Sequence, residues 1–328
     1  PRGYRRGKGD AVWQRLVVRH ESTGGLKFEL IGERARVEST SVYADVASLS
    51  DYIARMSDEG AVGRSTEEEQ KAFGVVLYQL LLPQALKGRL ANFDNTVLVV
   101  DDKTAAYPWE LLTPTEEGAP GDHARPLAVQ AGMIRQRVMS EFRSLPQSSE
   151  NWNALIVGAP NTEGWVDEKG SSLRFYDLPG AAKEADVVSE MLSTDDRPWT
   201  PTLLLGKKYS FERVRTALLE RSYRMVHLAG HGVVDQWISD VGDAPYARPI
   251  RKTGMLLSHQ QVLSAGDVEQ MDRVPEFVFI NCCYSGQDGT EAKSLGQRHY
   301  PKLAASLAMQ FIAMGSKAVI AAGWQVDD

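Results

Sequence analysis

Cysteine is nearly absent from this chain of 328 residues. The two cysteines, Cys282 and Cys283, are adjacent, so the sequence offers no disulfide framework and favours a reducing compartment. The chain also lacks an uninterrupted apolar run of about 18 residues, the length that marks a membrane-spanning helix, and it does not open with a signal-peptide pattern. We therefore expect a cytoplasmic protein that makes no contact with membranes.

The chain also has no excess of positive charge. The formal net charge is −6, which gives no overall attraction to nucleic acids, and only the first eight residues form a small basic tail. Hydrophobic residues make up 43% of the chain and charged residues 24%, the mix of an ordinary globular protein large enough for two domains. The chain begins at Pro1 without an initiator methionine, so we expect the natural start to lie upstream, or the chain to be a processed or engineered fragment.

The pattern of the chain divides it into three regions. Residues 1–65 form a β-rich module, in which the alternating stretches 14–20 and 26–31 predict a β-hairpin. Residues 66–150 form a connecting region with helical and β patterns, including a helix over 66–90 and a strand over 96–100. Pro108 is placed to start a short helix there.

From residue 151 onward, strand and helix patterns alternate. This order predicts an α/β fold with a mostly parallel sheet covered on both faces. The expected strands are residues 154–157, 202–205, 224–228, 277–280 and 318–322, and the expected helices are residues 181–192, 210–220, 264–271 and 303–314. Sheets of this kind place their ligands at the carboxyl ends of the strands.

Two reactive residues follow such strand ends. His231 comes after the apolar stretch 225–228, and Cys283 comes after the stretch 277–280. A thiol beside an imidazole is the minimum equipment of a cysteine nucleophile with its base. Because neighbouring residues of a strand face opposite sides, Cys282 and Cys283 cannot both face the imidazole.

Several blocks of this region resemble the CHAT-type caspase-like peptidases, which are relatives of caspases and separases. Cys283 follows His231 by 52 positions, close to the caspase spacing of roughly 50 residues. The resemblance covers about residues 70–328 and rests on blocks in the family's order at 107–112, 178–185, 227–232, 255–258, 263–268, 281–286 and 323–328. It implies a caspase-like catalytic domain over residues 151–328, with residues 66–150 as either a pseudo-protease or a connecting region.

The resemblance implies a Cys-His dyad and selects its members. In the family's histidine block the base is the histidine followed by glycine, which here is His231, and the nucleophile that precedes the Tyr-Ser-Gly run is Cys283. The backbone N–H groups of Gly232 and Cys283 would form the oxyanion hole. His227 and Cys282 are then expected to be core residues.

The resemblance also implies a pocket for the side chain before the scissile bond. By analogy with separase-like relatives, Trp324, Asp327 and Asp328 would line it, and Asp328 would pair with a basic side chain. The alternative is that Asp327 or Asp328 caps a turn or helix and that Trp324 is a core residue. The family pattern normally continues past this block, so the chain can be incomplete at its C-terminus.

Other chemistries match the sequence less well. His227 and His231 would be about 13 Å apart on a strand, too far to bind one zinc ion, and Pro201 stands where a phosphate-binding loop needs glycine. We expect neither a metal nor a cofactor.

The sequence therefore predicts a cysteine endopeptidase that acts on protein or peptide substrates. The resemblance suggests prokaryotic defence or cell death as its context and a regulatory protein, ligand or cleavage as its activator. The alternative is a catalytically silent module of the same fold that binds proteins.

Overall fold

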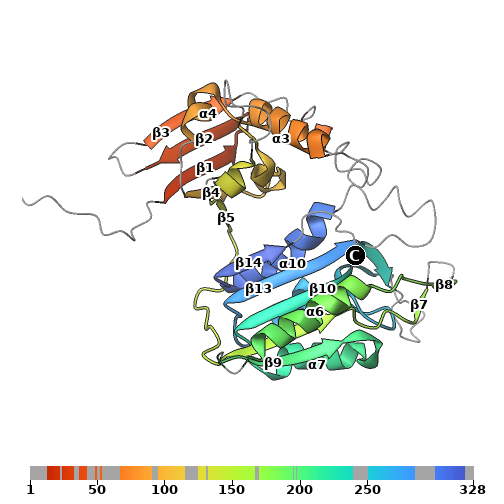
Figure 1. Cartoon of the computed structure of the whole chain (residues 1–328). Coiled ribbons are helices and arrows are strands. Elements are labelled where there is room, and N and C mark those ends of the chain that lie inside the picture. Colours follow the sequence, from red (N-terminus) through yellow and green to blue (C-terminus); the bar gives the residue numbers. More distant parts are fainter. Residues whose placement is uncertain are drawn as a thin grey trace, which may run out of the picture. The chain divides into compact units, whose positions relative to one another are not determined.

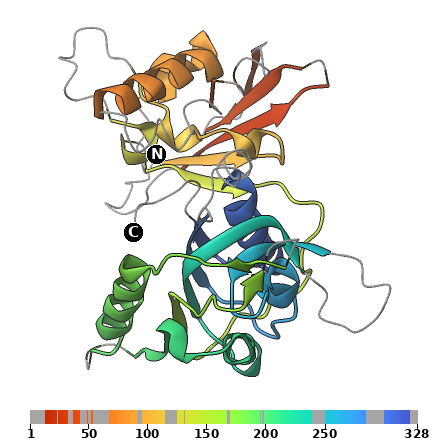
Figure 2. The ribbon, with the colours of Figure 1, turned by 90° about the vertical axis from the view of Figure 1, so that its right-hand side faces the viewer.

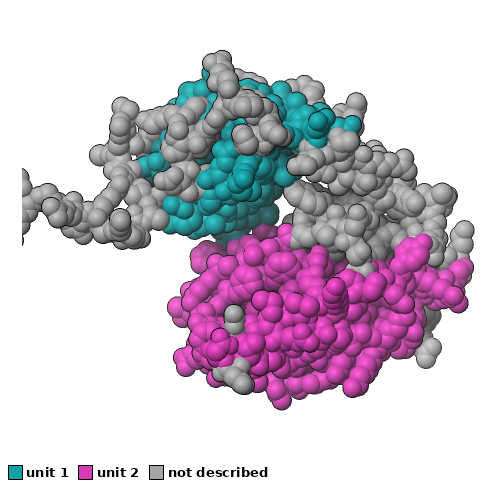
Figure 3. Space-filling model, viewed as in Figure 1, with its two compact units in different colours: residues 1–140 teal, residues 141–328 magenta. Residues whose placement is uncertain are grey.

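A computed structural model of the chain shows two compact units, residues 1–140 and residues 141–328 (Figures 1 and 3). The structure describes residues 13–22, 24–32, 37–42, 49, 52–53, 67–90, 95–114, 125–130, 132–166, 170–194, 196, 198–238, 250–284 and 300–321. The three-part division predicted from the sequence has its boundaries at 65 and 150, whereas the two compact units meet between Ser140 and Glu141.

The first unit is built on a mixed sheet in the order β3-β2-β1-β4-β5. Its strands are β1 (Gln14–His20), β2 (Leu26–Ile31), β3 (Val37–Val42), β4 (Thr96–Val100) and β5 (Ile134–Arg137). The predicted hairpin is confirmed, because β1 and β2 pair antiparallel from Arg15 opposite Ile31 to His20 opposite Leu26. β4 lies parallel to β1, so the β-rich stretch and the region after residue 66 share one sheet.

The helices of the first unit pack on this sheet around a shared core. The predicted helix over 66–90 is two helices, α3 (Glu67–Leu81) and α4 (Gln84–Leu90), because Pro83 between them has no N–H to continue the helix. The core centres on Trp109, whose ring meets that of Phe28 edge to face at 6.2 Å. Short helices η1 (Thr104–Ala106), η2 (Trp109–Leu111) and α5 (Leu127–Gln130) complete the described part.

The second unit contains a seven-stranded, mostly parallel sheet. Five parallel strands follow the order β9-β6-β10-β13-β14, and β11 and β12 continue antiparallel from the second half of β10. The strands are β6 (Asn153–Gly158), β9 (Thr200–Leu205), β10 (Met225–Ile238), β11 (Ile250–Leu256), β12 (Val262–Ser264), β13 (Phe277–Tyr284) and β14 (Ala318–Ala321). A separate small pair is formed by β7 (Trp165–Val166) and β8 (Ser172–Leu173).

Helices cover both faces of this sheet, as the alternation of patterns predicts. One face packs against α6 (Pro179–Leu192), which Figures 1 and 2 show lying along the sheet. The opposite face packs against α7 (Phe211–Glu220), α8 (Ala265–Glu269) and α10 (Tyr300–Met314) in one continuous core. The short η3 (Gly206–Lys208) follows β9. The α/β fold class with a separate small N-terminal sheet is thus confirmed.

Small residues allow α6 to approach the sheet closely. A Cβ atom added at Gly158, the last residue of β6, would lie 2.3 Å from the Cβ of Ala185 and 3.1 Å from the carbonyl oxygen of Ala181. Such contacts are too short for any side chain larger than hydrogen. Glycine at this position therefore determines how near α6 lies to β6 and, through it, to β10.

No helix within the described residues combines the length and the apolar character needed to cross a bilayer.

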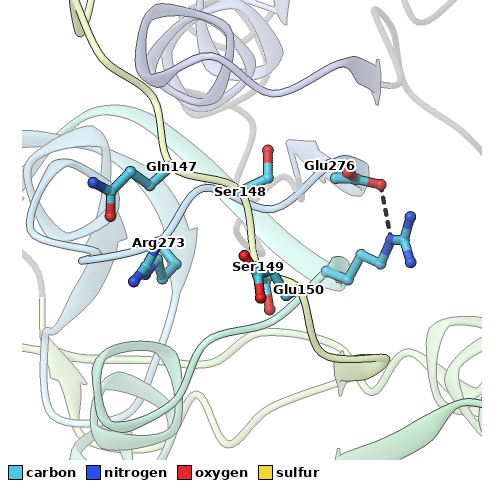
Figure 4. A pocket seen from close by; sticks show the side chains of 7 residues that line it. Gln147, Ser148, Ser149, Glu150, Arg273 and Glu276 are labelled. Atoms are coloured by element: carbon cyan, nitrogen blue, oxygen red, sulfur yellow. Dashed lines mark hydrogen bonds and ion pairs between the residues drawn. The ribbon is translucent and has the colours of Figure 1, made fainter.

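A charged cluster links three strands at their amino ends, beside a shallow open pocket of about 740 Å³ (Figure 4). Glu276, just before β13, accepts a hydrogen bond from Arg224 Nε at 2.8 Å, and Lys317 Nζ lies 2.5 Å from its other oxygen. Arg224 precedes β10 and Lys317 precedes β14. The Lys317 and Arg224 hydrogen bonds hold the pKa of Glu276 below its usual value.

We predict that Glu276→Ala destabilises the second unit by about 1 kcal/mol at neutral pH, since two charge-assisted hydrogen bonds are lost. Urea unfolding measures this change, with Glu150→Ala in the same pocket as the matched control. A lowered carboxyl pKa contributes stability above the usual carboxyl range that is lost as pH falls. The difference between Glu276→Ala and the unsubstituted protein should therefore vanish in acid. If Glu276→Ala and Glu150→Ala lowered the free energy of unfolding equally at neutral pH, the stabilising role of the Glu276 hydrogen bonds would be wrong.

Candidate active site

His231 and Cys283 occupy paired positions on two neighbouring parallel strands. β10 and β13 run in register from Met225 opposite Phe277 to Gly232 opposite Tyr284, and this register sets His231 opposite Cys283. The two strands extend further than predicted, because β11 pairs with β10 beyond Gly232 and prolongs it. Both residues therefore lie inside the sheet ladder, near its carboxyl edge, and not in loops after it.

Strand alternation separates the two cysteine positions. Cys282 lies in the core that faces α7, α8 and α10, is 3% exposed, and has its Sγ 3.7 Å from the carbonyl oxygen of Leu228. Position 283 belongs to the alternate set of β13, together with Phe279 and Asn281. Cys282 is therefore a core residue, as the sequence predicts.

The imidazole of His231 is held by the loop that precedes α6. Its Nε2 lies 2.6 Å from the carbonyl oxygen of Tyr176, and its ring lies 5.6 Å from that of Phe175 in a tilted arrangement. The side chain is buried, with 4% of its surface exposed. One segment that ends at α6 thus supplies both a polar and an aromatic contact to this histidine.

The partner of Nε2 determines which ring nitrogen can act as a base. A carbonyl oxygen only accepts hydrogen bonds, so Nε2 must carry the hydrogen and donate it to Tyr176. In a neutral imidazole the other nitrogen then has the lone pair. His231 is therefore assigned as the tautomer in which Nδ1 can take a proton.

An exposed ion pair follows Tyr176. Asp177 Oδ1 lies 2.8 Å from Lys207 Nζ, and this hydrogen bond is the main reason that the pKa of Asp177 is lowered, with a smaller contribution from His231. The same pair raises the pKa of Lys207. Because both groups are exposed, the pair contributes little to stability, but it places charge beside the buried histidine.

A polar cluster that the sequence analysis did not identify lies on the α6 face of the sheet. Glu184 of α6 accepts a hydrogen bond from Asn281 Nδ2 at 2.6 Å, and its other oxygen lies 3.0 Å from His227 Nε2. The ring of His227 stacks on that of Phe279 at 5.1 Å. His227 is buried, as expected of a core residue, but it belongs to a polar cluster.

The family of the chain follows from a comparison with protein-family models, in which the CHAT domain model matches residues 71–328. The chain belongs to the CHAT domain family. A search of curated proteins gave no match. The matched CHAT region includes all of the second unit and much of the first, including α4, β4 and β5.

The remaining residues expected from the CHAT resemblance have mixed placements. Gly232 is buried in β10, between Met255 of β11 and Tyr284 of β13. Trp324, Asp327 and Asp328 lie outside the described residues. The structure thus brings together His231, Gly232 and the backbone of Cys283.

We predict that the second unit loses stability as pH falls below about 6.5, the ordinary histidine pKa. Burial lowers the pKa of His227, although Glu184 opposes this effect, so the unfolded chain binds a proton more readily than the folded one. This single group should change the unfolding free energy by up to about 1.4 kcal/mol per pH unit.

Thermal unfolding between pH 7.5 and 5 measures this dependence in the unsubstituted protein and in His227→Gln, which should have a shallower slope. His259→Asn is the matched control, because His259 is exposed and its backbone φ of 55° suits asparagine. A slope that is unchanged in His227→Gln would show that another group titrates.

Proposed function

We propose that this CHAT-family protein is a cysteine endopeptidase in which Cys283 is the nucleophile and His231 the general base. The register that pairs the two residues on β10 and β13 is the observation that carries the proposal. Residues directly opposite each other on neighbouring strands are about 5 Å apart at Cα, which is within reach of a thiol and an imidazole. A binding module of the same fold has no need for this pairing.

The proposed reaction uses the tautomer set by Tyr176. Nδ1 of His231 takes the thiol proton, and the resulting thiolate of Cys283 attacks the carbonyl carbon of the scissile peptide bond. The electron pair of that carbonyl moves to its oxygen, where the N–H groups of Gly232 and Cys283 would stabilise the charge. The imidazolium then donates its proton to the leaving amine as the C–N bond breaks, and water hydrolyses the thioester.

Burial of His231 supports the view that activity is regulated. With 4% of its side chain exposed, the ring is inaccessible to a polypeptide substrate in this conformation. We propose that a regulatory protein, a ligand or a cleavage event opens the site, as is suitable for a peptidase that must be restrained in the cell. Prokaryotic defence or cell death is the context suggested by the CHAT resemblance.

The dyad predicts selective alkylation. Iodoacetamide or a peptidyl chloromethyl ketone should label Cys283 in the activated protein, and His231→Ala should slow the labelling about 100-fold, since the base that forms the thiolate is lost. Mass spectrometry of the peptide that contains both cysteines locates the label. Cys282→Ala is the matched control and should be labelled at the unsubstituted rate, whereas Cys283→Ala should not be labelled.

The outcome separates the enzyme from its alternative, a catalytically silent CHAT module that binds proteins. Labelling of Cys283 that does not depend on His231, or no labelling under any activating condition, would favour the binding module. New peptide termini produced from a diverse peptide library would identify the enzyme directly.

The proposed pocket makes a separate prediction about specificity. If Asp328 pairs with the side chain before the scissile bond, the library should be cut after arginine or lysine. Asp328→Asn should then lower kcat/KM for such peptides about 10- to 100-fold, the loss expected for a charged hydrogen-bonded pair. A preference for uncharged side chains would reject the role of Asp328 and leave the dyad unaffected.

A further inference from the structure

The cluster of Glu184, His227 and Asn281 joins three elements at one point below the candidate dyad. Glu184 Oε2 accepts from Asn281 of β13 at 2.6 Å, and Glu184 Oε1 lies 3.0 Å from His227 Nε2 of β10. One carboxylate of α6 therefore contacts both strands of the pair that carries His231 and Cys283.

The register places this cluster two to four residues before the dyad along the same two strands. His227 is opposite Phe279 and Asn281 is opposite Ala229, two positions before Cys283 is reached along β13. Because side chains alternate along a strand, positions 227 and 231 share one set of β10, and positions 281 and 283 share one set of β13. The cluster and the dyad thus belong to the same face of the sheet.

The surroundings of the cluster are apolar. On this face the neighbouring positions of β6 and α6 are Ala154, Ile156 and Ala185, all fully buried. The buried His227 loses its hydration there, whereas the Glu184 side chain keeps 28% of its surface exposed. A well-packed apolar group in place of His227 would serve stability equally well. The presence of a buried histidine in this cluster is therefore an argument for a role in the proposed site.

The geometry of the contacts indicates that role. The ring of His227 is held between Phe279 of β13, against which it stacks, and Glu184 of α6. Glu184 itself is fixed by the close approach of α6 that Gly158 and Ala185 permit. The backbone pairing fixes the register of β10 and β13, and this arrangement adds a restraint on how far the two strands can tilt against each other on the way to His231 and Cys283.

We propose that Glu184 is a positioning residue of the peptidase: through His227 and Asn281 it holds β10 and β13 so that His231 and Cys283 meet in reactive geometry. This inference rests on the proposed function. A displacement of about 1 Å between reacting groups can cost about 100-fold in rate, so the effect of losing the contact should be large for chemistry and small for substrate binding.

The test compares three variants. Glu184→Ala removes both contacts and should lower kcat, and the alkylation rate of Cys283, at least about tenfold, with KM within about twofold. Glu184→Gln should recover most of the rate, since its amide oxygen can accept from Asn281 and its NH₂ can donate to His227 Nε2. Asp186→Asn, an exposed acidic position on the same helix, is the matched control and should behave as the unsubstituted protein.

A spectroscopic readout makes the test independent of activity. With Glu184 present, a hydrogen on His227 Nε2 would face a carboxylate oxygen 3.0 Å away. An amide introduced by Glu184→Gln that keeps its oxygen towards Asn281 would instead donate to Nε2 and require the hydrogen to sit on Nδ1. The ¹⁵N chemical shifts of His227 at neutral pH should therefore exchange between its two ring nitrogens in this variant.

The outcomes distinguish failure of the inference from failure of the proposed function. If Cys283 is alkylated equally fast in the unsubstituted protein and in folded Glu184→Ala, the positioning role of Glu184 is wrong. The proposal that the protein is a peptidase is then unaffected. If Cys283 is unreactive in the unsubstituted protein whereas the tautomer changes, the cluster is real and the peptidase proposal fails.

Discussion

The parallel pairing of β10 with β13 is the constraint on which the rest of the site depends. Eight consecutive residue pairs fix the register, so each of these residues of β10 has one fixed partner on β13. It sets His231 opposite Cys283, and by alternation it sends Cys282 into the opposite core. A shift of one residue would exchange these two cysteines between the faces, so the chemistry proposed here is a consequence of backbone hydrogen bonding.

Helix α6 and the loop before it contribute side-chain and carbonyl contacts that the pairing of β10 with β13 does not supply. The loop supplies the carbonyl oxygen of Tyr176 to His231, and the helix, which begins three residues later at Pro179, supplies Glu184 to the polar cluster. The absence of a side chain at Gly158 lets α6 pack closely on β6. The helix therefore brings Glu184 to the strands of the proposed site as well as covering the sheet.

The sequence was sufficient to predict the parallel strands, because buried strands such as residues 154–157 are continuous apolar runs too short for a helix. It did not reveal β11 or the extension of β10 beyond Leu228, since residues 250–254 are largely polar or glycine and gain their strand conformation by pairing with β10. The contacts of Glu184 with Asn281 and His227 were also hidden. An acidic residue on an amphipathic helix normally faces solvent, and only the depth at which α6 packs brings this one to the strands.

The two histidines of β10 show how a partner atom determines what an imidazole can do. His227 faces a carboxylate and stacks on a ring, an arrangement that fixes its position and leaves burial to lower its pKa. His231 faces the carbonyl oxygen of Tyr176, which orients its ring. A base must change its charge during each turnover, and burial disfavours the charged form of His227. The register also sets His231, and not His227, opposite Cys283, so His231 is the histidine that we propose for proton transfer.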